Sequence, residues 1–138
     1  MQQHAAFFER AYRPFFLVTG AGTALVGLYA FAPAFAMAKV AKLPYLQDYT
    51  IIIQHWGIMV MLMGLFMMAS AVIPAWRTPI AVYSGIEKAF MVWLVLSHLR
   101  QPFAQGFIVP LILDSTVVLF TIAYFAACGL RWPAPEPL

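Results

Sequence analysis

Charged residues are scarce in this chain, where Asp, Glu, Lys and Arg together make up 9% of the 138 residues. Soluble domains carry about 25% charged and about 45–50% apolar residues, whereas 64% of this chain is hydrophobic. A chain with so few charges cannot cover its surface with polar groups, so the composition indicates an integral membrane protein. The length leaves room for one domain, residues 1–138, and for no separate soluble module.

Cysteine is nearly absent as well, because Cys128 is the only one. A single cysteine excludes a disulfide within the chain and a metal site built from cysteines alone. The chain also lacks a glycine-rich phosphate loop, and its net charge of +3 comes from basic residues scattered among the expected helix ends. That distribution suits contact with lipid headgroups and argues against a nucleic-acid partner.

Four apolar stretches are long enough to cross a bilayer, which takes about 20 residues. They predict an all-α fold, a four-helix transmembrane bundle that runs up-down-up-down with short loops. Residues 1–14 place Glu9, Arg10 and Arg13 among aromatic residues, so we expect a short interfacial segment there, followed by Pro14 in the first helical turn. The predicted helices cover residues 15–38, 50–73, 79–99 and 107–130.

Basic residues suggest an orientation for these spans. Cytoplasmic loops of membrane proteins carry an excess of Lys and Arg. The side of the termini has the larger number, so we expect a multi-pass protein of a bacterial-type inner membrane with both termini in the cytoplasm. The residues compared are Arg10, Arg13, Arg77 and Arg131 on that side, and Lys39, Lys42 and Arg100 on the other.

Small residues recur at every seventh position of the second predicted helix, at Gly57, Gly64 and Ala71. A stripe with this period lets a neighbouring helix approach closely at a shallow left-handed crossing. We interpret the stripe as an interface with another subunit. The leading hypothesis is therefore a non-enzymatic subunit or self-associating component, whose partners are the lipid bilayer and either further copies of the chain or a larger membrane complex.

Ionisable residues inside the spans are a second notable feature, because a charge at a helix centre costs about 2.5–3.5 kcal/mol. The third predicted helix carries Glu87 and Lys88, which are adjacent and do not share a helix face. We expect Lys88 to extend its amine toward the loop at residues 74–78, the direction in which its Cβ points. Glu87 has less freedom, and we expect it to be protonated or bonded to one of Thr23, Tyr83, Thr121 and Tyr124.

His55, His98 and Asp114 lie on three predicted helices but, by a rise of about 1.5 Å per residue, in the same half of the membrane. The two histidines could ligate the iron of haem b, and all three residues match a 2-His-1-carboxylate site for a divalent metal. Alternatively, Glu87 with His98 and Asp114 could bind a quinone or pass protons. An intramembrane redox protein is therefore the alternative function, and a small membrane enzyme or a proton-coupled transporter is a further one. The same residues could also serve only to join the helices.

The polar positions of residues 50–125 resemble those of small, mostly uncharacterised bacterial four-helix membrane proteins of the DoxX-like kind. This resemblance implies a compact bundle and a partnership with redox or respiratory proteins. It supplies no catalytic residues. The positions that carry it are His55-Trp56-Gly57, Pro74 with Arg77 and Pro79, Glu87-Lys88, and Asp114.

Overall fold

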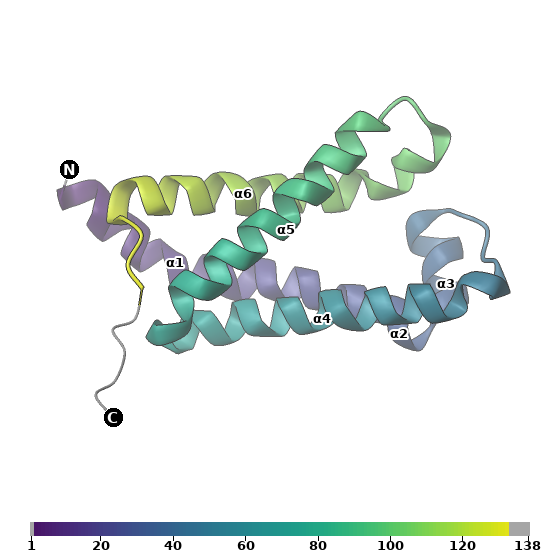
Figure 1. Ribbon diagram of the computed structural model, residues 1–138, viewed down its shortest axis with the longest axis horizontal. Helices are drawn as coiled ribbons and strands as arrows, with labels where there is room; N and C mark the ends of the chain where they lie inside the picture. The colour runs from purple at the N-terminus through teal and green to yellow at the C-terminus, as the bar shows by residue number, and fades with distance from the viewer. Residues whose placement is uncertain (1, 133–138) are drawn as a thin grey trace.

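The computed structural model describes residues 2–132, which contain helices and no strands (Figure 1). Four helical stretches are long and apolar enough to cross a membrane: Gln3–Phe31, Gln47–Val72, Pro74–Ser97 and Pro102–Cys128. They run up-down-up-down, so the start of the first stretch and the end of the last lie at one end of the bundle, here called the terminal end (Figure 1). The prediction of an all-α four-helix membrane bundle is confirmed.

Three of the four predicted helices have nearly the expected bounds. A short 3-10 turn precedes each of them, and the turns before the last two begin at a proline, which has no N–H to leave unpaired in a first turn, whereas the turn before the first is η3 (Gln47–Tyr49). The helices are α4 (Thr50–Val72), α5 (Arg77–Ser97) and α6 (Ile108–Cys128), and the turns that begin at a proline are η4 (Pro74–Trp76) and η5 (Pro102–Phe107).

The first helix begins earlier than expected, because α1 covers Gln2–Ala24 with Pro14 in its interior. Tyr12 and Phe16 are fully buried in the bundle core, and their rings stack with centroids 4.2 Å apart. Residues 2–14 are thus the first part of one continuous helix that packs in the bundle. The predictions of a separate segment over residues 1–14 and of a helix start at residue 15 are therefore wrong.

The end of the first span is also different, because the continuous helix does not reach residue 38. Ala32 leaves the helical region, with φ −138° and ψ 62°, as expected for a residue that precedes a proline. Gln54 Nε2 donates to the Ala30 carbonyl oxygen, 2.9 Å away, next to this break. The chain there consists of η1 (Leu25–Gly27), α2 (Leu28–Phe31), α3 (Pro33–Ala36) and η2 (Met37–Ala41).

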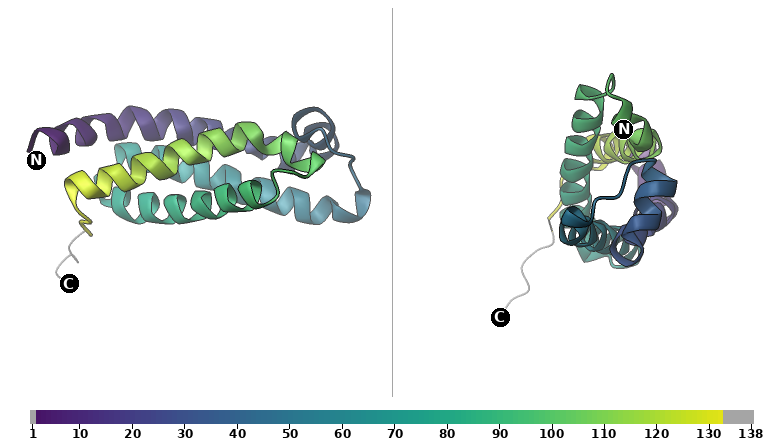
Figure 2. Two further views of the ribbon diagram at one scale, coloured as in Figure 1. Left: turned by 90° about the horizontal axis from the view of Figure 1, so that it is seen from above. Right: turned by 90° about the vertical axis from the view of Figure 1, so that its right-hand side faces the viewer.

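The first span and α4 lie side by side (Figures 1 and 2) and approach each other at small residues. Gly64 meets the backbone of Ala24, and a Cβ added at Gly57 would lie 2.5 Å from the backbone nitrogen of Ala30. Ala71, the third member of the stripe, is 1% exposed. The stripe therefore packs inside the bundle. The prediction that it faces a partner subunit is wrong, whereas self-association itself stays a prediction.

Helix α5 crosses the bundle diagonally (Figure 1) and packs mainly against α6. The buried residues of both helices recur every three, four or seven positions, which places them on one face of each helix. These faces bring the charged residues of the two helices together. They consist of Thr78, Ala81, Ser84, Lys88 and Val95 on α5, and of Asp114, Val117, Thr121, Tyr124 and Cys128 on α6.

Candidate functional site

The candidate site is a charge cluster buried between α5 and α6. Lys88 Nζ donates to Asp114 Oδ1 at 2.7 Å, and the two side chains are 3% and 8% exposed. Both residues lie near the middle of their spans, Pro74–Ser97 and Pro102–Cys128. The prediction that Lys88 extends toward residues 74–78 is wrong, because a carboxylate is available at the depth of the lysine itself.

Glu87 is the third member of the cluster. Its Oε2 atom is buried 3.8 Å from Lys88 Nζ, which is too far for a hydrogen bond, and finds no hydrogen-bond partner among the described residues. The side chain as a whole is 35% exposed, so it also reaches the outer surface of the bundle. There it is flanked along the helix by Tyr83 and Phe90, which are 56% and 59% exposed.

The predicted hydrogen bond from Glu87 to a neighbouring helix is not formed. The hydroxyl oxygens of Thr23 and Thr121 are buried without hydrogen-bond partners within residues 2–132, as is Glu87 Oε2. The other two expected partners, Tyr83 and Tyr124, make no hydrogen bond with Glu87 in that part of the chain either. Lys88 is the one cation beside the Glu87 carboxylate within residues 2–132, and because Lys88 turns toward Asp114, Glu87 shares it with Asp114.

His55 and His98 are both exposed, on α4 and directly after α5. The Nδ1 atom of His98 lies 2.9 Å from the carbonyl oxygen of Leu94 on its own helix. Within residues 2–132, no three His, Cys, Asp or Glu side chains lie close enough together to hold a metal ion. The structure therefore does not bring His55, His98 and Asp114 together, because Asp114 turns inward to Lys88 while the histidines lie at the surface.

The other two cofactor hypotheses stay predictions. Haem b would need only His55 and His98 as iron ligands. The position of Asp114 therefore does not test this hypothesis. His98 also lines an apolar groove of about 240 Å³ together with Met91, Leu94 and Phe103, where the ring of a quinone would find apolar contacts. Glu87 precedes Met91 by one helical turn, on the same side of α5.

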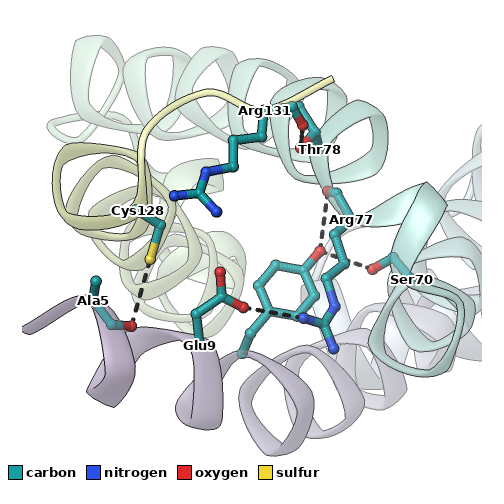
Figure 3. A network of polar contacts seen from close by, with 8 residues as sticks. Ala5, Glu9, Ser70, Arg77, Thr78, Cys128 and Arg131 are labelled. Atoms are coloured by element: carbon teal, nitrogen blue, oxygen red, sulfur yellow. Dashed lines mark hydrogen bonds and ion pairs between the residues drawn. The ribbon is translucent and has the colours of Figure 1, made fainter. Parts of the chain in front are cut away.

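A second polar network, at the terminal end, was missed by the sequence analysis. The hydroxyl oxygen of Tyr12 lies 3.0 Å from Ser70 Oγ and 3.1 Å from the carbonyl oxygen of Arg77, and so joins α1 to α4 and α5. Arg77 Nη1 donates to Glu9 Oε2 at 3.2 Å, and the guanidinium lies 5.2 Å from the centroid of the Tyr12 ring (Figure 3). Three of the four spans therefore meet at one phenol.

The end of the fourth span joins the same network (Figure 3). Thr78 Oγ1 donates to the carbonyl oxygen of Arg131, just after α6. Cys128 Sγ lies 3.6 Å from the carbonyl oxygen of Ala5 on α1. Cys128 is buried, as is usual for a free cysteine, which packs as a small apolar residue. The network fastens the four helices to one another at the terminal end.

The charge cluster can do three things chemically. The ion pair holds α5 against α6, the two carboxyl groups around one amine can hold a proton, and Glu87 can accept a hydrogen bond from outside the chain. No family model, no curated protein and no solved structure matches the chain. The resemblance to DoxX-like membrane proteins thus stays a prediction, and what the sequence and fold establish is a small membrane protein with four candidate spans.

Proposed function

We propose that the protein is a non-enzymatic subunit of a membrane complex and that it binds its partner through the outer face of α5, defined as Tyr83, Glu87, Phe90 and Leu94. The observation that carries the proposal is the state of Glu87, a partly exposed carboxyl group near the middle of a span whose Oε2 atom has no hydrogen-bond partner among the described residues. A polar group unpaired at this depth costs several kcal/mol, on the order of the ~2.5–3.5 kcal/mol found for a charge. The exposed part of the side chain also makes no hydrogen bond within residues 2–132, so a donor on a neighbouring helix would give the carboxyl group a partner from its outer side.

The partner that fits this face is a transmembrane helix with a cationic or hydroxyl side chain at mid-depth. Lys88 does not form a hydrogen bond with Glu87, because its Nζ atom lies 2.7 Å from Asp114 Oδ1 and 3.8 Å from Glu87 Oε2. The exposed rings of Tyr83 and Phe90 lie one turn to either side of Glu87 and offer apolar contact area around the polar bond. A second copy of the chain as the partner would be the self-associating form of the same proposal.

Site-specific photocrosslinking in native membranes tests this proposal. A photoreactive residue in place of Phe90 should give a discrete protein product, and the same residue in place of Leu119, which is 68% exposed on α6, should give none. Glu87→Leu should abolish the product at position 90, and a product of twice the chain mass would identify self-association. Equal products at both positions, lipid adducts alone, or a product that persists in Glu87→Leu would refute the proposal.

Proton transfer across the membrane is a second candidate, favoured by the ratio of charges in the cluster. One ammonium group, that of Lys88, lies beside two carboxyl groups. The cluster is therefore electrically neutral when one of the two carboxyl groups is protonated. Charge balance matters here because the bilayer interior screens an excess charge poorly. Liposomes that contain the protein and a pH-sensitive dye would show proton uptake that Glu87→Gln abolishes and the matched variant Glu9→Gln retains. No uptake above that of empty liposomes would refute this candidate.

A further inference from the structure

The terminal end of the bundle carries an excess of positive charge. Arg10, Arg13, Arg77 and Arg131 all lie at this end, whereas Glu9 is the one carboxylate found there within residues 2–132. The first turn of α5 and the end of α6 also mark where two apolar spans end, and therefore where lipid headgroups begin. The excess charge is thus at the depth of the headgroup phosphates.

Two of these arginines are brought together from different helices. Thr78 Oγ1 donates to the Arg131 carbonyl oxygen, which holds the chain after α6 against the start of α5. Arg77 is fixed in turn by its bond to Glu9 and by its contact with the Tyr12 ring. Figure 3 shows the side chain of Arg131 turned back toward Glu9, on the opposite side of that carboxylate from Arg77.

Within residues 2–132, the charge of this group is incompletely neutralised. Glu9 makes an ion pair with Arg77 at 3.2 Å, and Arg131 makes no ion pair with any carboxylate in the described part of the chain. The Nε atom of Arg77 is buried and has no hydrogen-bond partner there. One further monoanion beside the two guanidinium groups would balance the charge, and a phosphodiester offers a pair of non-bridging oxygen atoms to which guanidinium can bind with two parallel hydrogen bonds.

We propose that Arg77 and Arg131 form a binding site for the phosphate of an anionic phospholipid at the terminal end. Arg131 provides most of the attraction, because Arg77 is already paired with Glu9. The site is separate from the outer face of α5, so it holds whether or not that face binds a partner. It gives the terminal end a preference for one class of lipid, beyond the general attraction of basic residues to a charged surface.

Native mass spectrometry of the purified protein in neutral detergent tests the site, with phosphatidylglycerol and phosphatidylcholine as probes. The wild-type protein should bind phosphatidylglycerol more tightly than phosphatidylcholine, and Arg131→Gln should weaken the binding of phosphatidylglycerol about fivefold, the effect of one interfacial charge. Arg100→Gln, which removes an exposed arginine from the other end, is the matched control and should have little effect. Arg131 is preferred over Arg77 because its side chain makes no hydrogen bond or ion pair within residues 2–132, whereas Arg77 pairs with Glu9.

Three outcomes would overturn the proposal. Equal affinity of the wild-type protein for the two lipids would show no headgroup preference. Equal weakening by Arg131→Gln and Arg100→Gln would show an effect of net charge alone. Inorganic phosphate that binds the wild-type protein in an Arg131-dependent way, without any preference for phosphatidylglycerol, would assign the arginines to a free anion instead of a lipid.

Discussion

Replacing one member of the Lys88–Asp114 pair should destabilise the bundle strongly, whereas replacing both should not. Asp114→Leu removes the oxygen that lies 2.7 Å from Lys88 Nζ and leaves the amine with Glu87 alone, 3.8 Å away. Lys88→Met leaves the Asp114 carboxylate, 8% exposed, with no cation. Removing one partner of a buried pair costs about 3–5 kcal/mol, and apolar replacement of both is often neutral or stabilising. We therefore expect losses of about 3 kcal/mol or more for each single variant, and a smaller loss for the double variant, which still leaves Glu87 without Lys88.

The assay is reversible unfolding in mixed micelles, followed by circular dichroism as the fraction of denaturing detergent rises. Asp48→Leu, which removes an exposed aspartate two residues before α4, is the control and should change the free energy of unfolding by less than about 0.5 kcal/mol. The two single costs should not add in the double variant, because each arises from the partner left behind. A loss of less than about 1 kcal/mol of unfolding free energy in the single variants would refute the burial of the pair. A double variant whose loss equals the sum of the two single losses would refute the contact between Lys88 and Asp114.

Three smaller predictions use the same unfolding assay. Gly64→Ala should cost about 1–3 kcal/mol, because the added Cβ meets the backbone of the first span. The control Gly22→Ala should be nearly neutral, because its added Cβ would lie 3.4 Å from a flexible leucine side chain. Equal costs would contradict the internal position of the glycine stripe. Tyr12→Phe should cost about 1 kcal/mol through its lost hydrogen bonds, and no loss would place the hydroxyl in water. Gln54→Met should also cost about 1 kcal/mol and should speed amide exchange in Leu28–Phe31, and unchanged exchange would show that the side chain does not support that turn.

The spans that follow residue 50 could be predicted closely because apolar length alone defines them. The first span was predicted less well, for two physical reasons. Glu9, Arg10 and Arg13 suggested a wet segment, whereas Tyr12 in the same turns of the helix is buried against α4 and α5. Pro33 was visible in the sequence as a possible break, but the apolar run continues past it, and hydropathy does not register that the helix is interrupted at Ala32.

The ion pair was within reach of the sequence, whereas the state of Glu87 was not. Lys88 lies about 16 Å along the helix from Arg77, farther than a lysine side chain extends, so a partner at its own depth was the better expectation. Asp114 is the carboxylate near the middle of the next span and met that requirement. By contrast, the missing partner of Glu87 depends on the crossing of α5 over α6, and the inward position of the glycine stripe depends on which neighbour α4 meets. Neither follows from periodicity alone.

Solid-state NMR in lipid bilayers measures the central contact most directly. The chain has three lysines and two aspartates, so ¹⁵Nζ labelling of lysine and ¹³Cγ labelling of aspartate leave few pairs to distinguish. The dipolar coupling between the two labels should be that of a hydrogen-bonded pair, and it should disappear in Lys88→Met, which retains Lys39 and Lys42. No coupling in the wild-type protein, or a coupling that survives in Lys88→Met, would contradict the pairing of Lys88 with Asp114 inside the membrane.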